Sequence, residues 1–221
     1  MKYKLVIWDF DGVLADSEKI YMYNRQSYFN DKLHLNFDLE TTIKYFGGLS
    51  DFTNRTILEE LGYKTDDAFW KNLSEIDMDI IRKGLPTFKN IEDTLSVIPK
   101  QCIATGGVLS KTLEKIKAVG FWNKYFNISN TFTVDMVKKG KPEPDLFLYA
   151  ARQMKESPAD CIVIEDSIAG MTAAQRAGID VIAFLGCEMY QNDTYLQRVK
   201  DLGIQHICYT MPEVEKIILD S

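Results

Sequence analysis

Residues 5–12 read LVIWDFDG, so four apolar residues run directly into Asp9, Asp11 and Gly12. A short continuous apolar run that ends in turn-forming residues is typical of a strand buried on both faces. Residues two apart in a strand face the same side, and both carboxylates can therefore point beyond its end. One carboxylate could attack phosphorus while the other transfers a proton, and the pair also suits a hard cation such as Mg²⁺. Asp-x-Asp also occurs in solvated turns, so other motifs in the chain are needed to distinguish a catalytic pair from a turn.

Four further apolar runs follow the same design, at 102–104, 161–164, 181–184 and, more weakly, 206–209. Helical patterns lie between them at 111–119, 144–154 and 167–177, and two of these stop at Gly120 and Gly178. Strands that alternate with helices in this way predict an α/β fold, in which helices wrap a doubly wound, Rossmann-like parallel sheet.

The segment 16–85 has a different character, because it contains no convincing buried strand. Helix-like stretches occur near 17–29, 39–46, 51–61 and 66–83, with glycines between them and many aromatic residues. Most of these aromatics are expected to form the core of a separate unit. We therefore predict an α/β core from 1–15 and 86–221, with an all-helical insert over 16–85 placed just after the first strand.

The composition fits an ordinary globular protein, with 46% apolar and 26% charged residues. Lysine and arginine total 26 against 32 acidic residues, and the net charge of −6 argues against a broad nucleic-acid surface. No apolar run approaches the roughly 18 residues of a membrane span. The four cysteines form no C-x-x-C pair, which disfavours zinc and favours reduced thiols. We expect a cytoplasmic monomer without nucleic-acid or membrane partners.

Three more short motifs follow predicted strands, whose carboxyl ends meet at one edge of a parallel sheet. Thr105 and Gly106 offer a hydroxyl and an open backbone N–H, which can cradle a phosphate. Lys141, between a glycine and a proline, can supply a fixed positive charge to phosphoryl oxygens. Glu165 and Asp166 are acidic residues at a buried strand end, where a metal ion would offset their burial. Each motif taken alone also fits a purely structural role, as a turn, a solvated lysine or a helix cap.

Taken in order, these motifs resemble the haloacid dehalogenase superfamily of phosphatases over nearly the whole chain. The resemblance implies that Asp9 is the nucleophile and Asp11 the general acid and base. It implies phosphate binding by Thr105, Gly106 and Lys141, and Mg²⁺ binding by Asp9, Asp11, Glu165 and Asp166, where Asp11 uses its main-chain carbonyl. The helical insert resembles the family's cap over the active site. Residues 140–145 and 164–170 most resemble the branch of the β-phosphoglucomutases and phosphogluconate phosphatases.

The resemblance implies a Mg²⁺-dependent phosphatase that acts through an aspartyl-phosphate on a small phosphate monoester, either a sugar phosphate or a sugar-acid phosphate. A sugar-phosphate mutase is the main alternative, because it shares the first half of the reaction. Related mutases carry a basic residue directly after the serine of the stretch 47–50. This chain has Asp51 there and Arg55 only later, which favours the phosphatase.

Three other activities fit the sequence less well. Metal-free dehalogenases of this superfamily lack the second carboxylate, so Asp11 argues against them. A phosphonate hydrolase would need a Schiff-base lysine from the insert, and none of Lys19, Lys32 and Lys44 is well placed for that role. A receiver-like phospho-acceptor would share the acidic cluster, but such domains have no helical insert after the first strand.

Overall fold

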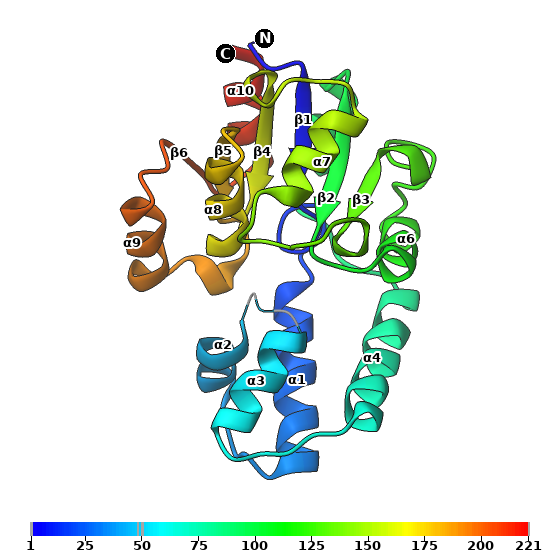
Figure 1. Ribbon diagram of the computed structural model, residues 1–221, viewed down its shortest axis with the longest axis vertical. Coiled ribbons are helices and arrows are strands. Elements are labelled where there is room, and N and C mark those ends of the chain that lie inside the picture. Colours follow the sequence, from blue (N-terminus) through cyan, green and yellow to red (C-terminus); the bar gives the residue numbers. More distant parts are fainter. Residues whose placement is uncertain (1, 48, 50, 221) are drawn as a thin grey trace.

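The computed structural model describes residues 2–47, 49 and 51–220, apart from the side chain of Phe52. Its centre is a six-stranded, all-parallel sheet with the strand order β3-β2-β1-β4-β5-β6 (Figure 1). The strands are β1 (Leu5–Trp8), β2 (Gln101–Thr105), β3 (Thr131–Thr133), β4 (Cys161–Glu165), β5 (Asp180–Phe184) and β6 (His206–Cys208). The predicted α/β fold with a doubly wound parallel sheet is therefore confirmed.

Helices cover both faces of this sheet, which is why its central strands read as continuous apolar runs. The helices are α5 (Ile91–Val97), α6 (Leu109–Ala118), α7 (Asp145–Gln153), α8 (Ile168–Arg176), α9 (Asp193–Asp201) and α10 (Met211–Asp220). Val6 and Trp8 of β1 belong to the core shared with α5, α6 and α10, whereas Leu5 and Ile7 pack with α7 and α8. Alternate side chains of one strand thus serve two cores, as the strand period of two requires.

A second group of helices lies beyond the carboxyl ends of the strands, in the lower part of Figure 1. These helices are α1 (Glu18–Leu33), α2 (Leu39–Phe46), α3 (Asp51–Glu60) and α4 (Asp67–Arg82), and all four follow β1 in the chain. They enclose a core of their own that includes Phe29, Phe46, Leu58 and Leu73. The predicted all-helical character of the insert is confirmed, while its exact limits at residues 16 and 85 stay a prediction.

Several elements differ from the sequence-based expectation. Strand β3 was not predicted, because three residues, Thr131–Thr133, form only a short edge strand between two short 3₁₀ turns. Helices α5, α9 and α10 also went unpredicted, and α1 runs on to Leu33, where His34 ends it in a left-handed conformation. Ser167 caps α8, since its hydroxyl accepts a bond from the N–H of Gly170.

The four cysteines, Cys102, Cys161, Cys187 and Cys208, are buried free thiols. Within the part of the chain that the structure describes, no helix has both the length and the apolar content to cross a bilayer.

Candidate active site at the strand ends

Three carboxylates converge at the carboxyl ends of β1 and β4. The two strands pair in register, with Trp8 beside Ile164, so Asp9 and Glu165 follow at the same level. Ligand oxygens of Asp9, Glu165 and Asp166 all lie within 4.8 Å of one another, and all three residues are buried. Carboxylate oxygens in such a cluster are the donors that Mg²⁺ prefers.

Two glycines make room for this cluster. Gly12 has a φ of +77°, and a Cβ there would lie 1.8 Å from Oδ2 of Asp166. A Cβ on Gly170 would lie 2.0 Å from Cδ of Glu165. Both distances are far shorter than any real contact, so a side chain at either position would displace a carboxylate of the site.

The electrostatics of the cluster favour a bound cation. Burial, and next the negative charge of Glu165, raise the pKa of Asp9 to about 7. Burial and the same neighbour raise the pKa of Asp166 well above its usual range. Neighbouring carboxylates in a buried site resist simultaneous ionisation, and a divalent cation between them removes that penalty. The donor set therefore fits Mg²⁺.

Lys141 binds directly to this cluster. Its Nζ donates to Oδ1 of Asp9 and to Oε2 of Glu165, both at 2.7 Å. Burial alone would lower the pKa of Lys141, but the two carboxylates outweigh burial and raise it, so the side chain stays charged. Glu165 is fixed from the other side as well, since its Oε1 accepts bonds from the hydroxyl and N–H of Ser167. Each carboxylate oxygen has two lone pairs, so Glu165 can position Lys141 and still reach a metal.

Asp11 takes a different position from Asp9, although both follow β1. Its Oδ1 accepts a hydrogen bond from the hydroxyl of Ser17 at 2.6 Å, and its Oδ2 is 2.5 Å from Nζ of Lys115. Burial would raise the pKa of Asp11, but Lys115 and Ser17 outweigh burial and lower it. The side chain of Asp11 is therefore held as a carboxylate, turned away from the three-carboxylate cluster.

Thr105 and Gly106 lie where β2 ends, beside β1 in the sheet. Thr105 is buried, and its Oγ1 accepts a bond from the N–H of Gly107 at 3.4 Å. A Cβ on Gly106 would meet no atom within 4 Å, so the backbone there is open to a ligand. The structure thus brings all the predicted site residues to one edge of the sheet.

Sequence reasoning missed a second set of polar residues, which joins the helical insert to the core. Asp77 of α4 is fully buried, and it accepts a 2.7 Å bond from Asn24 of α1 and a 2.9 Å bond from Lys111 of α6. Lys111 and Lys115 lie four residues apart and so share one face of α6. That i,i+4 pair of lysines, just after Thr105, is the signal that could have pointed to these contacts.

Replacing Asp77 with alanine should destabilise the protein by about 3 kcal/mol, because it removes a fully buried carboxylate and leaves two partly buried donors without their acceptor. For a chain of this size the midpoint of thermal unfolding should fall by roughly 6–12 °C. The matched control is Asp79→Ala on the same helix, which removes only an exposed ion pair with Arg82 and should shift the midpoint by about 1–2 °C. Equal shifts in the two variants would show that the Asp77 contacts contribute nothing special.

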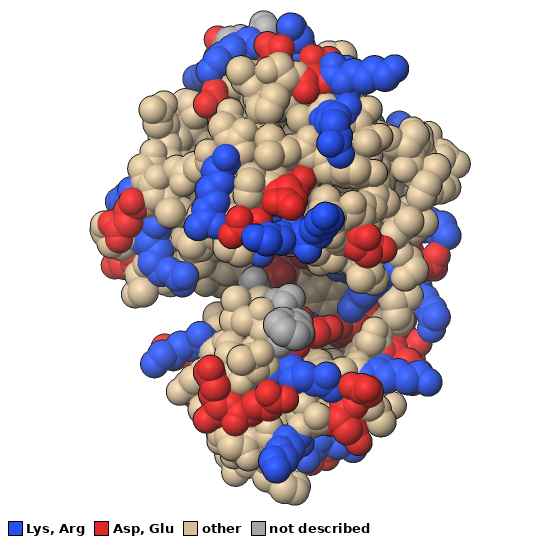
Figure 2. All heavy atoms as spheres, viewed as in Figure 1, with Lys and Arg blue, Asp and Glu red and all other residues tan. Residues whose placement is uncertain are grey.

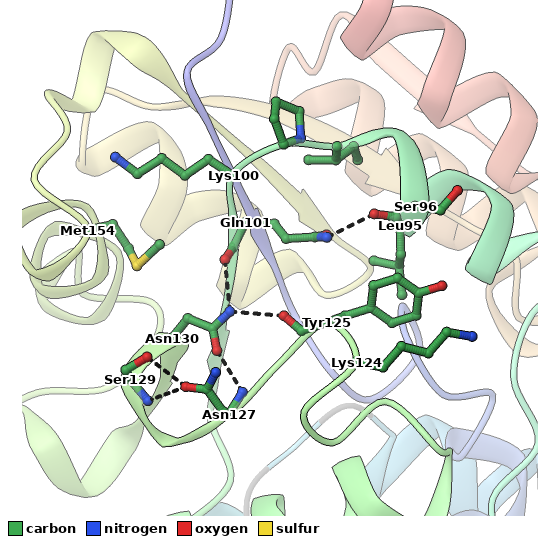
Figure 3. Close-up of a pocket in the computed structure, with 12 residues that line it drawn as sticks. Leu95, Ser96, Lys100, Gln101, Lys124, Tyr125, Asn127, Ser129, Asn130 and Met154 are labelled. Carbon is green, nitrogen blue, oxygen red and sulfur yellow. Dashed lines mark hydrogen bonds between the residues drawn. The ribbon is translucent and has the colours of Figure 1, made fainter.

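The molecular surface is hollowed between the helical insert and the sheet, and acidic atoms lie inside this hollow (Figure 2). A separate pocket of about 580 Å³ lies at the opposite end of β2, around Gln101 and Asn130 (Figure 3). Its polar groups bond one another: Asn130 donates to the carbonyls of Gln101 and Tyr125, and Asn127 accepts from Ser129. The carboxylate cluster found among the described residues lies at the strand ends and not in this pocket, so the hollow there is the candidate active site.

The family described as Haloacid dehalogenase-like hydrolase matches residues 6–184 of the chain. The chain is 33% identical over 184 residues to the bifunctional riboflavin kinase/FMN phosphatase of Arabidopsis thaliana, a match that covers 80% of this chain and 47% of that longer protein. It is 26% identical over 220 residues to the beta-phosphoglucomutase of Bacillus subtilis, covering 91% and 92% of the two chains. Other curated relatives carry the names phosphorylated carbohydrates phosphatase and (DL)-glycerol-3-phosphatase.

A solved structure, a conserved haloacid dehalogenase-like protein of unknown function from Agrobacterium tumefaciens, matches with a TM-score of 0.84 at 23% identity. The match covers 99% of this chain and 98% of that one, and it shows the shared fold. The chain therefore belongs to the haloacid dehalogenase-like hydrolases. Within them it falls in the branch of the β-phosphoglucomutase-like enzymes, among relatives that are phosphoric monoester hydrolases.

Proposed function

We propose that this protein is a Mg²⁺-dependent phosphatase that hydrolyses a small phosphorylated metabolite, a sugar phosphate or sugar-acid phosphate, through an aspartyl-phosphate on Asp9. One observation carries the proposal: Asp9, Lys141, Glu165 and Asp166 form a single buried cluster, with Nζ of Lys141 2.7 Å from the Asp9 carboxylate. In this proposal the cluster would supply a nucleophile, a fixed cation and metal-binding oxygens around one point.

Mg²⁺ would be held by the carboxylates of Asp9, Glu165 and Asp166 and by the main-chain carbonyl of Asp11. Bound there, it supplies positive charge to the phosphoryl oxygens and to the crowded carboxylates. The phosphate group would bind beside the metal, where Lys141, the hydroxyl of Thr105 and the N–H of Gly106 can donate to its oxygens.

The reaction then needs two displacements at phosphorus. A carboxylate oxygen of Asp9 attacks, the bond from phosphorus to the ester oxygen breaks, and Asp11 gives its proton to the departing alcohol. In the second step Asp11, now a carboxylate, takes a proton from water, and the oxygen of that water attacks the phosphoryl group. Inorganic phosphate leaves, Asp9 is regenerated, and Asp11 holds a proton again.

Asp11 can serve as the acid only after it exchanges its present partner. The ion pair with Lys115 keeps it ionised, whereas protonation of the alcohol needs the neutral carboxyl group. We infer that substrate binding turns the Asp11 side chain away from Lys115 and toward the ester oxygen. Helix α1 begins beside this residue and leads into the insert, so movement of the insert is a natural way to drive the exchange.

A sugar-phosphate mutase is the second candidate, favoured by the likeness to the β-phosphoglucomutase of Bacillus subtilis over 92% of that chain. It would transfer the phosphoryl group from Asp9 to a second sugar hydroxyl and not to water. The motif difference at 47–50 includes Gly48 and Ser50, which lie outside the described residues. Beside it, Asp51 pairs with Arg25, and Arg55 pairs with Asp67.

The deciding experiment is a phosphate-release screen over phosphorylated metabolites, run with Mg²⁺ and with EDTA, and including p-nitrophenyl phosphate. A phosphatase should release stoichiometric phosphate from at least one monoester and should lose this activity in EDTA. Sugar bisphosphate added as a phosphoryl donor would reveal a mutase, which interconverts sugar phosphates with little free phosphate. A receiver-like acceptor would accumulate phosphoprotein without repeated turnover.

We also propose the organisation that the pattern of strands and helices favours: a catalytic core of 1–15 and 86–221, and a cap of 16–85 that covers the active site. The net charge of −6 argues against a nucleic-acid ligand. We further propose a cytoplasmic monomer whose partner is a small phosphate monoester, without a membrane partner.

The stability of the metal-free protein should fall as the pH rises from about 4 to about 7. An Asp in the unfolded chain loses its proton near pH 4, whereas folded Asp9 keeps it until about pH 7, so the folded state binds more protons between these values. Mg²⁺ should reverse this penalty once the carboxylates are ionised. Thermal unfolding at pH 5 and pH 8, in EDTA and in Mg²⁺, checks the expectation. We expect Mg²⁺ to raise the midpoint by several degrees more at pH 8 than at pH 5, and an equal effect at both would contradict it.

A further inference from the structure

The helical insert contains buried polar atoms that the catalytic steps do not use. Arg25 is 7% exposed and Asn54 is fully buried. Among the described residues, nothing hydrogen-bonds Nε or Nη1 of Arg25, either amide atom of Asn54, or the hydroxyl of Tyr21. Buried polar groups in folded proteins are nearly always paired, so these five atoms together point to a ligand that pairs them.

These groups form a line that starts at the catalytic machinery. Ser17, Tyr21 and Arg25 follow one another at intervals of four, so they share one face of α1 and its N-terminal end. Ser17 bonds Asp11, and Nζ of Lys115 lies 5.0 Å from the ring centre of Tyr21. Cζ of Arg25 lies 5.8 Å from the same ring, which shows that its side chain leans back toward Tyr21. The line therefore runs from Asp11, where the leaving oxygen is protonated, into the insert.

Asn54 meets this line from helix α3. Nη2 of Arg25 donates to Oδ1 of Asp51 at 2.7 Å, across from α1 to α3. Asn54 lies three residues after Asp51, on the same face of α3. Arg25, Asp51 and Asn54 thus form one polar wall, with Tyr21 between them and Asp11.

The chemistry of the wall selects its ligand. The charge of Arg25 is already balanced, because it pairs with Asp51 and also lies in the fields of Asp77 and Glu18. The free atoms include acceptors as well as donors, since Oδ1 of Asn54 can only accept. A carboxylate or second phosphate cannot donate to that acceptor. It would also add negative charge to a group in which acidic residues already balance the cations, since Asp51 pairs with Arg25, Asp77 with Lys111 and Asp11 with Lys115. A hydroxyl group donates and accepts, so a polyol can satisfy every free atom without adding charge.

We propose that Tyr21, Arg25 and Asn54 form the subsite for the leaving alcohol, and that it takes an uncharged polyhydroxy group in preference to one that carries a carboxylate or a second phosphate. This inference rests on the proposed phosphatase activity and narrows its substrate class. Of the two classes considered above, it selects phosphorylated sugars or polyols and rejects phosphorylated sugar acids and bisphosphates.

Matched substrate pairs test the charge preference in the unmodified protein. Glycerol 3-phosphate and 3-phosphoglycerate differ by one CH₂OH against one carboxylate, and sorbitol 6-phosphate and 6-phosphogluconate form a second such pair. The hydroxyl member of each pair should have the higher kcat/KM, by about tenfold or more. A higher kcat/KM for the acid member of both pairs, or for fructose 1,6-bisphosphate over fructose 6-phosphate, would overturn the proposal.

Asn54→Leu tests the wall itself. The ratio of kcat/KM for the preferred polyol phosphate to that for p-nitrophenyl phosphate, whose leaving group has no hydroxyl chain, should fall by about 10–100-fold. The midpoint of thermal unfolding should rise by about 2–6 °C, because leucine replaces an unpaired buried amide. Glu60→Gln, an exposed position on the same helix, is the control and should change neither value. An unchanged ratio, or a fall in the midpoint, would contradict the assignment.

Asp51→Asn offers a gain of function that does not depend on damage to the fold. The substitution removes the negative charge that balances Arg25, at a carboxylate whose side chain is 43% exposed. The preference should then move toward the acid member of each pair, by about tenfold in the ratio of kcat/KM. No movement in that ratio would show that Arg25 does not face the leaving group.

Failure of this inference can be separated from failure of the proposed function. If p-nitrophenyl phosphate is hydrolysed but the ratios do not respond to Asn54 or Asp51, the subsite is wrong and the phosphatase assignment stands. If no phosphate monoester is hydrolysed in the presence of Mg²⁺, both fall together.

Discussion

Asp9→Asn should abolish the release of phosphate from every monoester, with a fall in kcat of about 10⁴-fold or more. An amide oxygen is a far weaker nucleophile than a carboxylate and contributes no charge to a metal site. The change keeps the size of the side chain and an oxygen near Lys141, so the fold should survive. Steady-state phosphate release and acid-quenched labelling of the protein by a radioactive phosphate ester measure the two consequences.

The control for this substitution is Asp180→Asn, at the exposed start of β5, where the carboxylate accepts bonds from Lys2 and Tyr3 among the described residues. It should retain wild-type turnover. Asp9→Asn protein that still turned over near the wild-type rate, or that still became labelled, would show that another residue is the nucleophile.

Lys141→Met should lower kcat by about 10²–10³-fold, the cost of losing one fixed electrostatic contact to the reacting group. Methionine keeps the length of the stem but removes the charge that Asp9 and Glu165 share. Two buried carboxylates then lose their cation, so the variant should also need more Mg²⁺ for half-maximal activity. A titration of activity against Mg²⁺ therefore measures both effects in one experiment.

Lys139→Met is the matched control, because Lys139 lies two residues earlier in the same loop with its side chain exposed. It should leave kcat and the Mg²⁺ requirement unchanged. If Lys141→Met behaved like this control, the contacts of Lys141 with Asp9 and Glu165 would be structural and not catalytic.

The candidate site could be predicted largely from the sequence because its residues follow parallel strands directly. Strands β1 and β4 pair with Trp8 beside Ile164, so Asp9 directly after β1 and Glu165 at the end of β4 arrive at one place. The strands themselves could be predicted because both of their faces are buried, which makes them continuous apolar runs. Strand β3 could not be predicted, because its three residues at the sheet edge are too few to show a periodic apolar pattern.

The contacts made by helices could not be predicted in the same way. Lys115 reaches Asp11 only because α6 turns one particular face toward β1, and that rotation depends on packing throughout the core. Asp77 reads as an ordinary charged residue of an exposed helix until α1 and α6 enclose it. The pairing of Arg25 with Asp51 likewise joins two helices whose mutual position no local pattern gives.

The ion pair between Asp11 and Lys115 bears on how long a phosphorylated Asp9 would survive. Cleavage of that acyl phosphate by water needs a base beside it, and Asp11 cannot serve while Lys115 holds it. The intermediate would then persist as a store of transferable phosphoryl group for as long as the side chain stays turned away. The rate at which Asp11 leaves Lys115 would then set the lifetime of the phosphorylated protein. A longer lifetime would favour transfer of the phosphoryl group to a second alcohol over its loss to water. Lys115, a buried lysine of α6, would thus set how often the phosphoryl group passes to water.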